Sequence, residues 1–196
     1  MRRASWILLF AMCSLSFPVK AQQHQDIPSL FAQLNQMSTT DRAAKHLLAA
    51  AGRDPTVRQQ AAERLPAMID NPEINEIWLN AVRLAGKLKI LETVPPLQRA
   101  FPRGQLGRPL VMTFGTVALL NDDVVAKALA EIGDPSLPAV RGFLRDTDPK
   151  MRRRAVLILR NINSTESRIV LQEHLPVETD PGIKNLIING LDHPDR

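Results

Sequence analysis

Apolar residues recur at helical spacing along most of the chain. Within residues 149–162, Met151, Ala155, Ile158 and Ile162 follow one another at steps of four, three and four, which places them on one face of a helix. Strand signals are weak, because the chain has no Tyr and no alternating β-branched run between turn dipeptides. The pattern predicts an all-α fold. Helices are expected at residues 27–37, 40–51, 55–69, 74–88, 93–101, 106–120, 123–132, 136–145, 149–162, 165–174 and 181–191.

A five-residue motif begins three of these helices. It consists of Asp-Pro, any residue, an aliphatic residue and a basic residue, and it occurs at residues 54–58, 148–152 and 180–184. The Asp would accept hydrogen bonds from the free N–H groups of the first turn, and Pro fits there because its missing N–H is not needed. The motifs at 148 and 180 are separated by the length of one helical hairpin, that is, two antiparallel helices and their turn. Such spacing predicts stacked hairpins, none of which could bury its apolar face alone.

The best-defined repeat lies around residues 126–155. Gly133 would end one helix with a positive φ, and the Asp-Pro that follows it would start the next. The apolar spacing then continues into the helix at 149–162. The residues that carry a family resemblance are Ala126, Leu129, Ala130, Glu131, Ile132, Gly133, Asp134, Pro135, Leu137, Pro138 and Val140, followed by Asp148, Pro149, Met151, Arg152 and Ala155.

These residues resemble HEAT repeats, especially the short bacterial repeats that also occur in phycobilisome lyases. The resemblance covers about residues 54–191 and is strongest over 123–162. It implies a right-handed α-α superhelix, a solenoid of antiparallel helix pairs that mediates protein–protein contact. It also implies hydrogen bonds between neighbouring repeats from the charged residues of the motifs. These structural residues would be Asp54, Arg58, Asp148, Arg152, Asp180 and Lys184.

The remainder of the chain departs from this pattern. Residues 22–53 would form a divergent N-terminal helical cap, residues 54–191 the repeat domain and residues 192–196 a C-terminal tail. Within the repeat domain, several Gly and Pro residues lower the helix propensity of residues 102–122. A kink or an insertion is expected there.

The first 21 residues have the layout of a secretory signal peptide. Arg2 and Arg3 precede an apolar stretch at 4–17, and small residues at Val19 and Ala21 suit cleavage near Ala21. An uncleaved anchor is the alternative, although the apolar stretch is short for a span. The layout predicts a periplasmic or secreted protein without a transmembrane segment in its mature form.

Cleavage would change the chemistry open to the protein. The leader holds three basic residues and no acidic one, so the formal net charge would fall from +5 to +2. That small charge argues against nucleic-acid binding. The single cysteine, Cys13, would leave with the leader, so neither a disulfide nor a thiolate metal site is expected.

No catalytic or cofactor-binding motif is present in the sequence. The four histidines, His24, His46, His174 and His193, are not at metal-ligand spacing. We therefore expect no cofactor, no metal and no enzymatic activity. A HEAT-like bilin lyase or alkylpurine DNA glycosylase is the less favoured alternative, because export and low charge oppose both.

Three features have a structural and a functional interpretation. Trp78 falls on an apolar helix face, where core packing is favoured over a binding anchor. Asp122 and Asp123 are expected to cap a helix rather than bind a cation. Asn163 begins an N-glycosylation acceptor sequence, but Ser164 or Thr165 is expected to cap the helix that follows.

A basic stripe is the candidate partner-binding surface. With Ala155 at the centre of the buried face, Lys150, Arg153, Leu157 and Arg160 fall on the opposite side of their helix. The structural interpretation is a solvated helix face. The functional interpretation is a strip that binds an acidic segment or an anionic surface. The favoured function is thus an exported scaffold that binds another protein, and the alternative is an envelope-associated structural or anionic-surface-binding protein.

Overall fold

A computed structural model describes residues 26–104 and 123–192, and the elements in these two ranges are helical, with no strand. The longer helices are α1 (Ile27–Leu34), α2 (Thr40–Ala51), α3 (Thr56–Asp70), α4 (Glu76–Leu88), α5 (Val94–Ala100), α7 (Val124–Ile132), α8 (Leu137–Phe143), α9 (Pro149–Ile162), α10 (Thr165–His174) and α11 (Pro181–Asp192). Short 3-10 turns precede or follow three of them: η1 (Leu91–Thr93), η2 (Phe101–Arg103) and η3 (Asp134–Ser136).

The all-α prediction is confirmed, and the helices start and end within a few residues of the predicted positions. Several predictions lie outside the described residues. They are the signal peptide at 1–21, the helix at 106–120, the tail beyond Asp192, and most of the kink or insertion at 102–122.

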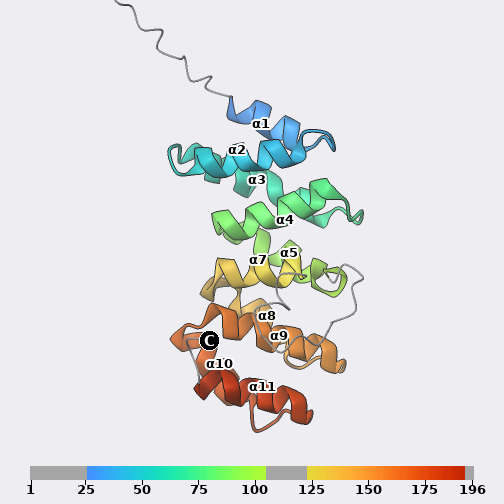
Figure 1. Cartoon of the computed structure of the whole chain (residues 1–196), viewed down its shortest axis with the longest axis vertical. Coiled ribbons are helices and arrows are strands. Elements are labelled where there is room, and N and C mark those ends of the chain that lie inside the picture. The colour runs from blue at the N-terminus through green and yellow to red at the C-terminus, as the bar shows by residue number, and fades with distance from the viewer. Residues whose placement is uncertain (1–25, 105–122, 193–196) are drawn as a thin grey trace, which may run out of the picture.

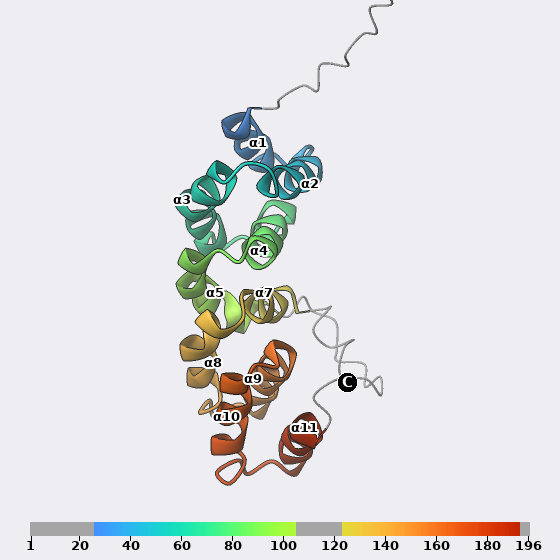
Figure 2. The same ribbon diagram turned by 90° about the vertical axis from the view of Figure 1, so that its left-hand side faces the viewer.

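The helices form two rows of a single column, as Figures 1 and 2 show. One row holds α1, α3, α5, α8 and α10, and the other holds α2, α4, α7, α9 and α11. Along the second row each helix packs against the next, from α2 to α11, and each pair also packs internally. The helices α1 and α2 stand at the N-terminal end of the column (Figure 1).

The core runs continuously along the column between the two rows. Trp78 of α4 is buried there, and its indole Nε1 donates a hydrogen bond to Ile69 O of α3 at 2.9 Å. Core packing, the structural interpretation of Trp78, is therefore confirmed. Gly86 brings α4 and α7 close together, because a Cβ at this position would lie 2.7 Å from Ala128 Cα.

Local signals explain most helix ends. Asn75, Asp123, Asp148 and Ser164 each accept a hydrogen bond from a backbone N–H in the first turn of the helix that follows. Gly133 ends α7 with φ +86°, a conformation that residues with a Cβ rarely adopt. The predicted caps at Asp123 and Ser164 are thus confirmed.

Two local details depart from simple helix rules. Pro66 lies inside α3, which continues through it to Asp70, because packing on both sides of α3 outweighs one lost backbone hydrogen bond. The helix predicted at 74–88 begins two residues later, at Glu76, and Ile74 lies before it with 39% of its surface exposed.

Among the described residues, every helix is too short or too polar to cross a membrane.

Candidate functional site

The helix α9 lies in the middle of the C-terminal half of the column. It packs against α7 and α8 on one side and against α10 and α11 on the other. Asp148 caps it by accepting a hydrogen bond from Lys150 N at 2.9 Å. Two arginines near its start, Arg152 and Arg154, point to different neighbours.

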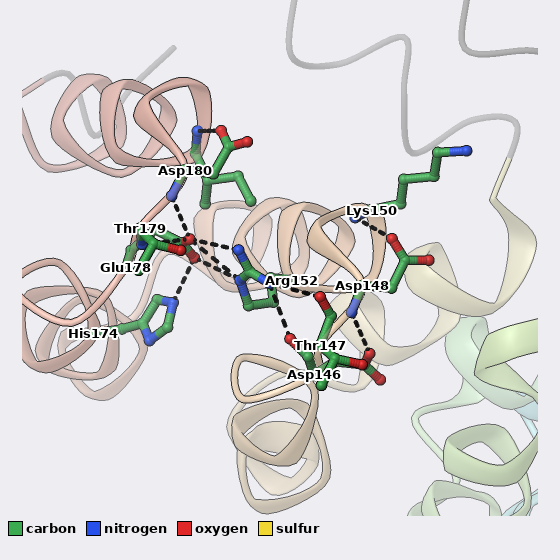
Figure 3. Close-up of polar contacts among 10 residues, drawn as sticks. Asp146, Thr147, Asp148, Lys150, Arg152, His174, Glu178, Thr179 and Asp180 are labelled. Atoms are coloured by element: carbon green, nitrogen blue, oxygen red, sulfur yellow. Dashed lines mark hydrogen bonds and ion pairs between the residues drawn. The ribbon is translucent and has the colours of Figure 1, made fainter.

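Arg152 reaches forward to the connection between α10 and α11, where Glu178 is buried (Figure 3). Its Nη2 donates to Glu178 Oε1 at 2.8 Å, and its Nε donates to Oε2 at 3.0 Å. Its Nη1 donates to the carbonyl oxygens of Asp146 and Thr147 at 3.0 and 3.2 Å. One guanidinium therefore joins two turns that belong to neighbouring helix pairs.

The carboxylate of Glu178 accepts hydrogen bonds from several other groups. Its Oε1 accepts from the backbone N–H groups of Thr179 and Asp180 at 2.8 and 2.9 Å, and its Oε2 lies 2.9 Å from His174 Nε2. Burial by itself would raise the pKa of Glu178. The hydrogen bonds from Arg152, Asp180, His174 and Thr179 outweigh burial and lower the pKa from 4.5 to about 2.

Arg154 reaches backward into the preceding pairs. Its Nε donates to Asp123 Oδ2 at 2.6 Å, and its Nη2 donates to Phe101 O at 2.6 Å. The guanidinium also lies 3.9 Å from the centroid of the Phe101 ring, and that ring stacks on Phe143. Both charged side chains of this ion pair are only 6% exposed.

A cleft of about 350 Å³ opens beside Glu178, between the ends of α8 and α10. Leu144, Val170 and Val177 supply apolar side chains to its lining. Arg141 and Arg145 line it from the α8 side, and Arg141 forms an ion pair of 3.2 Å with Glu173 of α10. The Arg152–Glu178–His174 group forms part of its wall.

The six residues that the resemblance implied as links between repeats fall into three kinds. Arg152 makes such a link. Asp54, Asp148 and Asp180 accept hydrogen bonds from backbone N–H groups at the starts of their own helices. Arg58 and Lys184 make no side-chain hydrogen bond or ion pair within the part of the chain that the structure describes.

The packing of α9 leaves only part of the predicted basic stripe exposed. Lys150 is exposed, but Leu157 is only 3% exposed, so the expectation of an outward leucine is wrong. The physical reason is that α9 is an inner helix with neighbours on two sides, so the side opposite Ala155 is covered as well.

The two other members of the stripe are half-buried. The Arg153 Nε is buried without a hydrogen-bond partner. The Arg160 stem lies against Gly190 of α11, where a Cβ would come within 2.7 Å of its Cδ. Burial lowers the pKa of Arg160. Binding by Lys150, Arg153 and Arg160 stays a prediction.

Sequence reasoning missed the residues that hold α9 to its neighbours. Glu178 precedes a motif without belonging to it, and Arg154 lies inside a basic run that resembles a solvated surface. Asp123 was predicted as a cap but not as the partner of an arginine on α9. One signal was present: Arg154 lies one position before the buried Ala155, and a polar residue at such a place needs a buried partner.

The polar groups around Glu178 serve to hold helices together rather than to carry out catalysis. The Glu178 carboxylate is ionised above about pH 2, and its accepting sites are filled. A carboxylate with such a low pKa and with its oxygens already hydrogen-bonded is a poor general base near neutral pH. Within residues 26–104 and 123–192, no three His, Cys, Asp or Glu side chains lie close enough together to hold a metal ion.

Stacked helix pairs that are joined by polar links define an α-helical repeat protein. Residues 122–192 match the family model for HEAT repeats. The predicted resemblance is thus confirmed there, and the column as a whole has the HEAT-like all-α fold. No curated protein matches the chain in sequence.

Proposed function

We propose that this protein is an exported, non-catalytic scaffold that binds another protein through the surface of its helical column. The observation that carries the proposal is the continuous stack of helix pairs, which includes the HEAT-repeat segment at 122–192. HEAT repeats generally mediate protein–protein interaction, because their stacked pairs offer an extended surface to a partner.

We also propose that the protein is not a catalyst. Glu178, the buried carboxylate beside the C-terminal cleft, supports this, because its hydrogen bonds and its pKa of about 2 suit a structural link. A His–Glu pair that borders a cleft would otherwise be a natural candidate for acid–base chemistry.

Export is proposed from the basic and apolar layout of residues 1–21. Cell fractionation and the mass of the mature protein test it. We expect recovery outside the cytoplasm with the N-terminus near Gln22. Cytoplasmic recovery of the uncleaved chain would remove export from the proposal and reopen the enzymatic alternatives.

Partner binding is tested by chemical crosslinking in the native envelope fraction, followed by affinity purification under denaturing conditions. We expect one protein to be crosslinked reproducibly and to bind the purified chain directly. A chain that crosslinks to nothing, and that floats with anionic vesicles instead, would support the alternative role at a lipid surface.

Lys150 and Arg153 remain our proposed contacts on α9. The variant Lys150→Glu should weaken capture of the crosslinked partner without changing helicity, because Lys150 is exposed. Arg160 is a poor choice for this test, since its replacement would disturb packing against Gly190. Unchanged capture by Lys150→Glu would remove this end of the stripe from the partner-binding surface.

A further inference from the structure

We infer that the C-terminal cleft between α8 and α10 binds an acidic segment of a partner protein, in which an apolar side chain lies next to a carboxylate. The inference rests on the proposed protein-binding function and assigns it a surface different from the predicted stripe. The cleft of about 350 Å³ is near the lower end of the roughly 300–1,000 Å³ typical of ligand sites.

The apolar part of the cleft would receive the apolar side chain. Leu144 and Val170 are buried at its base, whereas Val177 is 67% exposed, the largest fraction among the exposed large hydrophobic residues of the described chain. An exposed valine beside two buried aliphatic residues leaves apolar area that an incoming side chain would cover.

The charges at the cleft favour a carboxylate next to that side chain. Arg145 is exposed and makes no side-chain hydrogen bond or ion pair within the described residues. Arg141 and Glu173 are paired, but with 52% and 60% of their side chains exposed, so this pair is weak and open to exchange. A partner carboxylate would therefore form an ion pair with Arg145 and compete with Glu173 for Arg141.

The wall of the cleft is already fixed before a partner binds. Arg152 and His174 are both hydrogen-bonded to Glu178, so the three side chains need no reorganisation. Preorganised surfaces lose less entropy on binding.

The probe for the test is a fluorescein-labelled, amidated heptapeptide with the sequence Gly-Ser-Glu-Leu-Glu-Ser-Gly, measured by anisotropy at low and high salt. Two analogues serve as controls: one has Gln in place of both Glu, and the other has Ser in place of Leu. We expect the acidic peptide to bind, with a salt-sensitive affinity, and both analogues to bind at least about fivefold more weakly.

Variants of the protein locate the site. Arg145→Glu should weaken binding of the acidic peptide at least about tenfold, and Val177→Ser several-fold. The matched control is Arg58→Glu, since Arg58 is an exposed arginine on α3 whose side chain also makes no hydrogen bond or ion pair within the described residues. It should bind the peptide as the wild type does. Amide shifts on peptide addition should concentrate at residues 141–145 and 177–179.

Three results would overturn the inference: no binding of the acidic peptide, equal binding by Arg145→Glu, or shifts confined to another surface. Vesicles of phosphatidylglycerol that bind through Arg145 while the peptide does not would also overturn it in favour of a lipid surface. Failure of the cleft inference can be told apart from failure of the proposed function. If the native partner is captured equally by wild type and Arg145→Glu, the scaffold function stands and only the cleft is excluded.

Discussion

Arg152 and Arg154 lie two positions apart on α9, yet they join it to opposite neighbours. Arg152 reaches forward to Glu178, in the connection between α10 and α11. Arg154 reaches backward to Asp123 and to the carbonyl oxygen of Phe101. The first region borders the cleft and is partly open to water, whereas both side chains of the second ion pair are almost completely buried.

The difference shows how a repeat protein is held together beyond its apolar contacts. A helix in the middle of the column has a neighbour on each side, so side chains that point away from one neighbour meet the other. The link at Arg154 is almost closed to solvent, so water would have little access to replace a lost partner. At Arg152, several other donors surround the same carboxylate. The two links should therefore respond differently to substitution.

The largest effect is expected at Arg154. The variant Arg154→Met should lower the free energy of unfolding by about 3–5 kcal/mol, because Asp123 would remain buried without its partner. Urea denaturation measures it. The matched control is Arg153→Met, which removes a neighbouring arginine whose Nε has no partner and should change stability little. Equal losses of stability in the two variants would mean that the Arg154–Asp123 ion pair contributes little to the stability of the fold.

The next effect is a loss of stability in acid. The pKa of Glu178 is lowered from 4.5 to about 2, so its contribution is fully present above pH 4.5 and is lost as the pH falls towards 2. The loss should reach up to about 3 kcal/mol. Urea denaturation between pH 2.5 and pH 6 measures it. Glu178→Gln should be less stable at pH 6 and show a flatter profile; a parallel profile would refute this assignment.

A smaller effect is expected at Arg152. The variant Arg152→Met should cost about 2 kcal/mol, since Glu178 keeps its bonds to Thr179 N, Asp180 N and His174. The result should be compared with Lys150→Met, which removes an exposed cation from the same turn. A cost above that of Arg154→Met would reverse the order that burial predicts.

The smallest effect is expected for the helix caps, which act within one element. Asp148→Ala and Asp54→Ala should each cost about 1 kcal/mol, because each Asp accepts one backbone N–H at the start of its own helix. Thermal unfolding of both variants measures this. If Asp148→Ala cost as much as Arg152→Met, the motif would act between repeats through its Asp as well as its Arg.

Much of the fold could be predicted from the chain, because helix starts and apolar spacing are local. The motif at 148–152 marked the start of α9, and Gly133 marked the end of α7. The exceptions have a tertiary cause. Pro66 lies inside α3 despite its lost hydrogen bond, and Leu157 is buried although the helical period placed it outward.

The candidate site could be predicted only in part. The family resemblance implied that Arg152 links neighbouring repeats, but its partner Glu178 has no local signal, because it lies in a connection 26 residues away. The same holds for Arg145 and Val177. They meet at one cleft only because α8 and α10 end on the same side of the column.

The sequence by itself determined the helices, their caps and their assembly into pairs, since these depend on hydrogen bonds and apolar contacts between residues close in the chain. The tertiary structure alone decided which charges are buried. Burial depends on which helices flank a side chain, and a helix enclosed on both sides leaves little of its surface to water. Arg152, Arg153 and Arg154 follow one another in the sequence, and stacking makes of them a link forward, a half-buried cation and a link backward.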